Sequence, residues 1–508
     1  MLHPTGRAGP WWYLRTGAVE SGIGFVVGTA LLASGALGIV STAVALTDGQ
    51  HRLRLALVAV ALTVAGLAVA RICRPPLRLR PSTAFSGVLA AWLTLIACST
   101  ATYLVLGTFE RPDDALFESV SGYTTTAATV LLDPESVGRG VLTWRAGTQW
   151  LGGLAGLLFV VAVLPSLGVG GLDVTTVGPR HGGTSLRGHR TSAQMRRLAT
   201  LYTTFTMVGV VLYLLAGMGG FDSFTYAATT ISTGGFANHA ESFSHFDSAA
   251  IEWAGIGGMV LGGANMALLY RALRGRELRA VWRSFEMRSY ATAVLVGGAV
   301  LALVTAPGGG PTLESSRQAL FHVASATSTT GHWVGVGWGT WDPGPQVLLL
   351  ALMGVGAMSG SAGGGFRQVR ALALVASLRR ELVRQLHPQA AGRARVGRRP
   401  VDDELVSRMV GYQAQYLLVG GIGAVVVAAL GTDLPTAVSG AISSLANVGP
   451  ALGELEPGAG GVLQLPRPAR VALLPLMLLG RLEIAPVLVG VALGFGAVRR
   501  QVPRSRGM

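Results

Sequence analysis

Long apolar runs constrain this chain more than any other feature of its sequence. Half of the 508 residues are hydrophobic and 13% are charged, about half the charged share of an average soluble domain. Apolar runs of about 18 residues or more indicate membrane-spanning helices. We therefore predict an all-α polytopic membrane protein with spans at about 21–46, 55–73, 84–107, 141–164, 198–220, 248–270, 289–306, 345–377, 410–430 and 469–497.

The charge distribution predicts the orientation of these spans. All 40 basic residues are arginines, and they exceed the 25 acidic residues to give a net charge of +15. The arginines cluster in alternate loops, which the positive-inside rule assigns to the cytoplasm. Membrane topology therefore explains the charge better than nucleic-acid binding does, and we expect the cytoplasmic membrane with both termini inside. The arginine clusters lie before residue 16, at 71–80, 180–197, 271–288 and 367–408, and after residue 498.

Four short segments between spans align with one another: "ALFESVSGYTTTAAT", "SFTYAATTISTGGFA", "ALFHVASATSTTGHW" and "AVSGAISSLANVGPA". The aligned positions are Ala127, Gly235, Gly331 and Gly449, at intervals of 108, 96 and 118 residues. Hydroxyl residues stand six positions earlier in each, at Ser121, Thr229, Ser325 and Ser443.

Each aligned segment is too short to cross a membrane. We therefore predict a helix, a re-entrant pore loop and a helix, repeated four times around one ion pore after two extra transmembrane helices. The expected boundaries are 1–80 for the two extra helices, 81–180, 181–285 and 286–400 for repeats one to three, and 401–508 for repeat four with the tail.

A repeat of this kind can form a binding site for a cation. Non-helical backbone at membrane depth is tolerated where it is buried in protein or lines a water-filled cavity. Four re-entrant loops around one axis would present rings of backbone carbonyls, which can replace the hydration shell of a potassium ion. The short helix before each loop would point its C-terminus, with its partial negative charge, toward the axis. Glycine suits the loops because its φ can be positive and it has no Cβ.

Several stretches resemble one known family. They are "TWRAGTQWLGGL" at 143–154, "GSAGGGFRQVR" at 360–370, "NVGPALG" at 447–453 and "LLGRLEIAPVL" at 478–488. Together with the four loops they resemble the Trk/Ktr/HKT superfamily of potassium transporters over about residues 20–497. The two extra helices favour its TrkH/TrkG-type membrane subunit over the shorter KtrB type.

The resemblance implies a potassium filter, a gate and partners. The implied filter residues are Thr125, Thr126, Thr233, Gly234, Thr329, Thr330, Asn447 and Val448, just before the glycine positions Ala127, Gly235, Gly331 and Gly449. The implied gate lies at about 356–366, with Gly360, Ser361, Gly363, Gly364, Gly365 and the pore arginine Arg481. The implied partners are potassium, lipid, a second copy of the chain and a cytoplasmic TrkA-like nucleotide-binding regulatory subunit. No bound cofactor, transition metal or enzymatic activity is expected.

Simpler interpretations stay open for some of these residues. The Gly-rich gate segment could be a close helix-packing face. Arg481 could pair with Glu483, although two residues apart on a helix do not share a face. Arg145 lies near the start of a span, where its side chain could reach the interface. For His322 and His332 we expect packing or surface roles.

Two positions depart from the family pattern, because Ala127 replaces a glycine and Ala362 replaces a threonine. A left-handed alanine costs about 1 kcal/mol or more, and its methyl group could narrow the ion path. Two functions therefore remain: potassium uptake, or a weakly selective or poorly conducting homologue with a regulatory or assembly role. A secondary transporter is less favoured, because inverted repeats would place re-entrant loops on opposite sides.

Overall fold

The computed structural model describes residues 13–73, 81–160, 187–276, 278–306, 310–335, 337–387, 395–397, 399–400, 403–456, 461–484 and 486–488. Within these ranges the chain is helical apart from loops and one two-stranded antiparallel pair, β1 (Arg395–Val396) and β2 (Arg399–Pro400). Six of the described helices are long and apolar enough to cross a membrane, or seven if one bent pair counts as a span. The prediction of an all-α polytopic membrane protein is confirmed.

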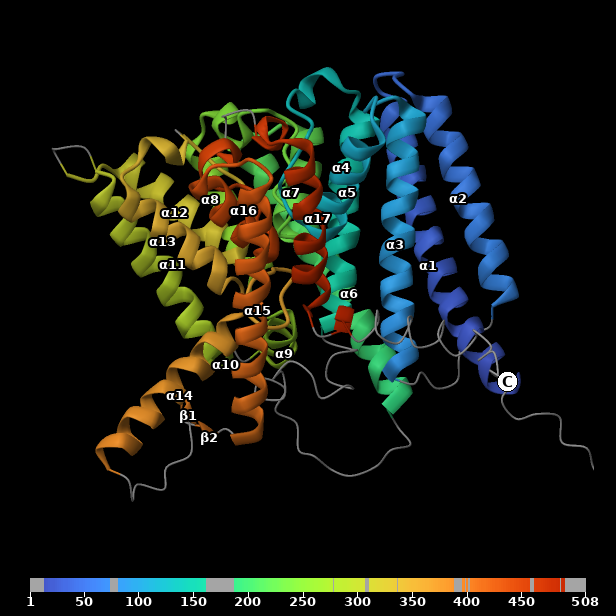
Figure 1. Cartoon of the computed structure of the whole chain (residues 1–508). Coiled ribbons are helices and arrows are strands. Elements are labelled where there is room, and N and C mark those ends of the chain that lie inside the picture. Colours follow the sequence, from blue (N-terminus) through green and yellow to red (C-terminus); the bar gives the residue numbers. More distant parts are fainter. Residues whose placement is uncertain are drawn as a thin grey trace, which may run out of the picture.

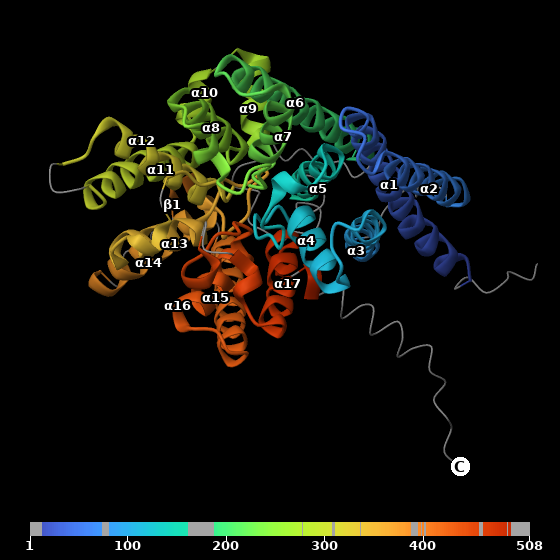
Figure 2. The same cartoon turned by 90° about the horizontal axis from the view of Figure 1, so that it is seen from above.

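Four groups of three helices form the body of the molecule. Each group places a short helix between two other helices, and Figure 2 shows the groups in chain order around a common centre. The short helices have 12 to 16 residues, fewer than the ~20 that a membrane span needs. The groups are α3 (Pro81–Leu106), α4 (Pro112–Thr124), α5 (Arg139–Leu158); α6 (Arg187–Leu215), α7 (Gly220–Ile231), α8 (Ala249–Gly262); α11 (Phe285–Val304), α12 (Leu313–Ser328), α13 (Pro343–Val355); and α15 (Asp403–Ala429), α16 (Leu434–Ala446), α17 (Arg467–Leu482).

The remaining helices lie outside or below this arrangement. Helices α1 (Tyr13–Ala45) and α2 (Arg52–Ile72) stand upright beside α3, and α14 (Gln368–Leu386) extends away from the bundle (Figure 1). Helices α9 (Met266–Gly275) and α10 (Leu278–Arg283) connect the second group to the third.

Three predicted spans are not continuous helices. The span at 248–270 bends by 98° between α8 and α9, where the Asn265 side chain accepts a hydrogen bond from Leu268 N and caps the new helix. The span at 345–377 is interrupted by a non-helical segment at 356–367, as the gate interpretation expected. In the last span, α17 ends at Leu482 and Glu483 has a positive φ of 64°; residues 484 and 486–488 are helical again, and residues 489–508 lie outside the described ranges. Hydropathy misses such breaks because it is averaged over a whole span and does not register one capping residue or a few glycines.

Glycines bring each short helix close to a neighbouring segment. A Cβ added at Gly262 would lie 2.8 Å from Ile231 O, and one added at Gly363 would lie 2.7 Å from Ser328 O. Only glycine permits such an approach to a carbonyl. The same relation recurs four times, pairing Gly152 with Tyr123 O, Gly262 with Ile231 O, Gly363 with Ser328 O, and Gly480 with Leu445 O.

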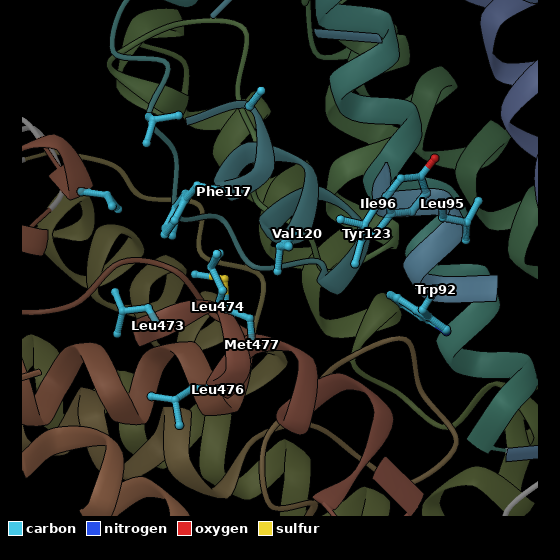
Figure 3. Packing of buried hydrophobic residues seen from close by; sticks show 14 of the residues in the cluster. Trp92, Leu95, Ile96, Phe117, Val120, Tyr123, Leu473, Leu474, Leu476 and Met477 are labelled. Atoms are coloured by element: carbon cyan, nitrogen blue, oxygen red, sulfur yellow. The ribbon is translucent and has the colours of Figure 1, made fainter. Parts of the chain in front are cut away.

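Buried apolar side chains hold the first short helix in place. Figure 3 shows Phe117, Val120 and Tyr123 of α4 together with residues of α3 and α17 in one buried cluster. Lipid tails are as apolar as these side chains, so close packing rather than exclusion of water stabilises the cluster. The cluster therefore positions the loop that follows α4. The neighbours drawn are Trp92, Leu95 and Ile96 of α3 and Leu473, Leu474, Leu476 and Met477 of α17.

Candidate functional site: four convergent loops

The loops after the four short helices share an unusual backbone conformation. Thr125, Thr233, Thr329 and Asn447 have φ values of 54°, 54°, 61° and 57°. Left-handed backbone is uncommon for β-branched residues such as threonine. Strain of this kind persists where the surroundings fix it and is common at functional sites. The sequence alignment placed these four residues at equivalent positions, and the structure gives them the same conformation.

Three of the aligned glycine positions bring neighbouring loops into contact. Gly235, Gly331 and Gly449 have φ values of 79°, 86° and 104°, which an L-residue rarely adopts. A Cβ at Gly235 would collide with Thr330 O, and one at Gly331 would collide with Val448 O. The glycines thus allow carbonyl oxygens of one loop to lie against the backbone of the next.

In the third and in the fourth loop, a buried serine hydroxyl group bonds to the loop backbone on both sides. Ser325 Oγ accepts a hydrogen bond from Gly331 N at 3.0 Å and donates one to His332 O at 2.6 Å. Ser443 Oγ does the same with Gly449 N at 2.9 Å and Pro450 O at 2.8 Å. These serines are two of the hydroxyl residues that recur six positions before the aligned point. Their role is to fix the loop backbone.

The first loop departs from this pattern at Ala127. Its φ is not positive, and its N–H donates to Val448 O of the fourth loop at 3.2 Å. Ser121 Oγ instead lies within hydrogen-bonding distance of Thr126 O and Ala128 O. Two carbonyls near the loop centre, Thr126 O and Val448 O, therefore already have hydrogen-bonding partners within the protein.

The methyl group of Ala127 lies between the loops. A Cβ added at Gly235 or at Gly331 would approach the Ala127 Cβ to 2.7 Å. The side chain of Asn447 also reaches the first loop, donating to Thr126 Oγ1 at 3.1 Å. The alanine thus occupies space that a glycine would leave open.

A buried ion pair joins α4 to α5, and its arginine also bonds to the second loop. Arg145 Nε lies 2.6 Å from Glu118 Oε1, and its guanidinium also donates to Ala237 O at 2.7 Å and Thr129 Oγ1 at 3.0 Å. Arg145 is 3% exposed, so the alternative that its side chain reaches the membrane interface does not hold. The carboxylate comes from the first short helix and attracts the guanidinium into the protein.

The segment at 356–367 lies against the loops. Gly364 N donates to Thr329 Oγ1 at 2.7 Å, and a Cβ at Gly364 would collide with Ala446 O. The segment also bonds to the break between α8 and α9, since Met266 N donates to Gly360 O at 3.0 Å. The glycines of this segment therefore allow its backbone to pack against the C-terminal ends of α12 and α16.

Arg481 joins this segment to α5. Its Nη1 donates to Ala362 O at 2.6 Å and its Nη2 to Gly152 O at 2.9 Å. The pairing with Glu483 that we considered is not what the structure shows, because Glu483 pairs with Arg370 at 2.6 Å. Within the described residues, Arg481 is a buried cation held by carbonyl groups. A buried charge at membrane depth is a candidate for function.

The two histidines near the third loop have packing roles. His322 is buried, bonded to Val334 O at 2.8 Å and to Trp338 Nε1 at 3.0 Å. His332 is buried and stacks on Tyr226. Both fit the packing role expected for them.

An open pocket lies beside the convergent loops. Ala127, Gly235, Gly331 and Gly449 line it together, and His239 and Glu456 also contribute to its lining. Burial alone would lower the pKa of His239, but the carboxylates of Asp222 and Glu135 outweigh it and raise that pKa. The four aligned loop positions therefore line an open pocket.

Comparison with known proteins identifies the family. The TrkH family model, described as cation transport protein, matches residues 54–295 and 311–495. The chain belongs to the TrkH family of cation transport proteins. It is therefore a multi-pass membrane transport protein.

Named relatives agree with this assignment. The chain is 35% identical to the Trk system potassium uptake protein TrkH of Halomonas elongata over 381 residues, covering 74% of this chain and 78% of that protein. It is 32% identical to TrkI of the same organism, covering 85% and 87%. The crystal structure of the potassium transporter TrkH from Vibrio parahaemolyticus superposes with a TM-score of 0.82 at 28% identity, covering 92% of this chain and 98% of that one.

The buried ion pair yields a stability prediction. Replacing Arg145 by methionine leaves Glu118 buried without its partner, which typically costs about 3–5 kcal/mol. We expect a clearly lower midpoint for thermal unfolding of the purified protein in detergent.

The double variant E118Q/R145M serves as the control, because it removes both charges. It should regain much of the lost stability, and equal destabilisation of the single and double variants would contradict the role of the pair.

Proposed function

We propose that this member of the TrkH family takes up potassium across the cytoplasmic membrane through a filter formed by the four loops. The observation that carries the proposal is the convergence of four loops, in which Gly235 and Gly331 lie against carbonyl oxygens of the neighbouring loops. The relatives' names, Trk system potassium uptake protein, support potassium as the transported ion. Carbonyl rings of this kind can replace the hydration shell of potassium.

The proposed ion ligands are the oxygens of Thr125, Thr126, Thr233, Gly234, Thr329, Thr330, Asn447 and Val448. Four of them have left-handed backbone, namely Thr125, Thr233, Thr329 and Asn447. This conformation turns the chain from each short helix into its loop. The C-termini of the four short helices add partial negative charge at the same place.

The proposed gate consists of the segment at 356–367 and Arg481. Its glycines Gly360, Gly363, Gly364 and Gly365, with Ser361, form non-helical backbone. These glycines disfavour a helical conformation of the segment, since each costs about 1 kcal/mol relative to alanine in a helix. The guanidinium of Arg481 holds Ala362 O and places a positive charge against the approach of a cation.

We further propose the assembly and orientation that the resemblance implied. Both termini are cytoplasmic, two chains form a dimer, and a TrkA-like nucleotide-binding subunit regulates the gate. Helix α14 extends away from the bundle (Figure 1) and carries the exposed arginines Arg379 and Arg384. It therefore offers a positively charged surface, continuous with the proposed gate, for an acidic partner. The repeat boundaries 81–180, 181–285, 286–400 and 401–508 belong to this proposal.

One observation favours a second function. Val448 O accepts a hydrogen bond from Ala127 N, and the methyl group of Ala127 occupies space between the loops. A chain whose filter is closed in this way would conduct poorly and would act as a regulatory or assembly subunit.

The filter proposal is tested by Gly331→Ala. The new Cβ would collide with Val448 O at a positive φ, and a left-handed alanine alone costs about 1–2 kcal/mol. Rubidium uptake into proteoliposomes should fall by about tenfold or more.

Gly257→Ala is the matched control, since open space surrounds Gly257 on an exposed helix face. Its uptake should equal that of the wild type, and a Gly331→Ala protein that also transports normally would contradict the filter.

The gate proposal is tested by Arg481→Gln, which removes the charge but keeps a hydrogen-bond donor. Without a regulatory subunit, rubidium uptake should rise several-fold because the barrier to cations is lowered. Arg467→Gln, at the exposed first residue of the same helix, should leave uptake unchanged. Unchanged or slower uptake by a folded Arg481→Gln protein would show that Arg481 is a structural residue.

The Ala127→Gly variant distinguishes potassium uptake from the role of a poorly conducting regulatory or assembly subunit. Removing the methyl group should increase rubidium uptake and raise the ratio of rubidium to sodium uptake, whereas Ala128→Gly should change neither. A silent wild type with an active Ala127→Gly variant would establish the poorly conducting homologue. No effect on rate or ratio would show that the methyl group does not shape the filter.

A further inference from the structure

Three metal-binding side chains meet where the loops of the first and second groups touch. Glu135 lies in a short 3-10 turn (Pro134–Ser136) after the first loop, while His239 and His245 follow the second loop. One ligand atom from each of the three lies within 4.8 Å of the other two. The contact joins parts of the chain that are 104 residues apart, so local spacing in the sequence gives no sign of it.

The distances suit a single small cation. His239 Nδ1 lies 3.3 Å from Glu135 Oε1. Two ligands that each bind Zn²⁺ at about 2.0–2.1 Å in tetrahedral geometry are separated by about 3.3 Å. The position between these two atoms therefore has the size of a zinc site before any side chain moves.

The third ligand lies next to the second but has to turn before both can bind one ion. The rings of His239 and His245 stack with centroids 3.5 Å apart and an angle of 4° between their planes. Phe246 stands edge-on to both rings, at 5.5 Å and 5.2 Å. The lone pair of an imidazole nitrogen lies in the ring plane, so two stacked rings cannot both direct a nitrogen at one ion. His239 is held by Glu135 and Asp222, whereas His245 is exposed and would rotate out of the stack to bind the ion.

The backbone fixes the carboxylate, and the surroundings supply further negative charge. Ala240 N donates to Glu135 Oε1 at 3.1 Å, which holds Glu135 against the second loop. Asp222 Oδ1 lies 3.5 Å from His239 Nε2, a contact typical of a carboxylate that orients a metal-binding histidine. Glu135 and His245 are exposed, so an ion can enter from solvent.

We propose that Glu135, His239 and His245 bind a divalent transition-metal ion of the Zn²⁺ type at the rim of the pocket, linking the first loop to the second. Two imidazoles and one carboxylate form a ligand set that zinc accepts, with a fourth position for water. Magnesium and calcium prefer oxygen ligands and are poor candidates. The site does not depend on the proposed potassium pathway. It is also a site that the sequence did not predict, since no transition metal was expected.

The test is direct titration of tag-free protein in detergent with ZnCl₂ by isothermal calorimetry. The wild type should bind one Zn²⁺ per chain, and MgCl₂ should give no binding at this site. Glu135→Gln, His239→Gln and His245→Gln should each weaken zinc binding by about tenfold or more, since each removes a ligand.

His51→Gln is the matched control, because His51 is also a loop histidine but has no part in the cluster. It should bind zinc as the wild type does. His245 is exposed, so His245→Gln folds normally, and an elution profile equal to that of the wild type verifies this. A wild type without saturable zinc binding, or a His245→Gln protein with wild-type affinity, would show that Glu135 and His239 form only an ion pair between loops.

Discussion

Backbone groups that lie within a membrane must find their partners inside the protein, and the rest of this structure follows from that constraint. Four short helices end inside the bundle and leave carbonyl groups that no further helical turn satisfies. Glycines of neighbouring segments approach these ends closely, and two serines bind the loop backbone on both sides. These contacts account for part of the unusual number of glycines, 72 in 508 residues.

The same constraint explains the buried arginines. Arg145 bonds to a carboxylate and to loop oxygens, while Arg481 bonds to carbonyls of α5 and of the segment at 356–367. Both therefore connect elements from different groups. They differ in charge balance, because Arg145 has Glu118 as its counterion whereas the described contacts of Arg481 are neutral carbonyls. That difference is why Arg481, rather than Arg145, is the candidate for an electrostatic barrier.

Much of the fold was predictable because its signals are periodic. The apolar runs predicted the long helices, and the alignment of Thr125, Thr233, Thr329 and Asn447 predicted four equivalent positions that share one conformation. The interruption at 356–367 was predicted from glycine and from the family resemblance. The bend at Asn265 and the break after Leu482 were missed, because hydropathy does not register a cap or a break. The burial of Arg145 was missed because its counterion lies 27 residues away, and the cluster of Glu135, His239 and His245 joins two loops.

Ala127 shows how one methyl group changes a repeated structure. Sequence alone indicated that an alanine would resist the positive φ of the other three loops, and the first loop does avoid it. The consequence was not predictable: Ala127 N turns toward Val448 O of the fourth loop. The backbone preference of Ala127 thereby affects the fourth loop, because Val448 O accepts this hydrogen bond. Fewer loop carbonyl groups then remain without a partner inside the protein.

The central claim is that a potassium-sized ion binds among the four loops. Crystals of the wild-type protein grown in rubidium chloride, with data collected at the rubidium absorption edge, test it most directly. The account predicts an anomalous peak enclosed by the loops, close to the oxygens of Thr329, Thr330, Asn447 and Val448. Rubidium peaks elsewhere in the protein, with none between the loops, would contradict it.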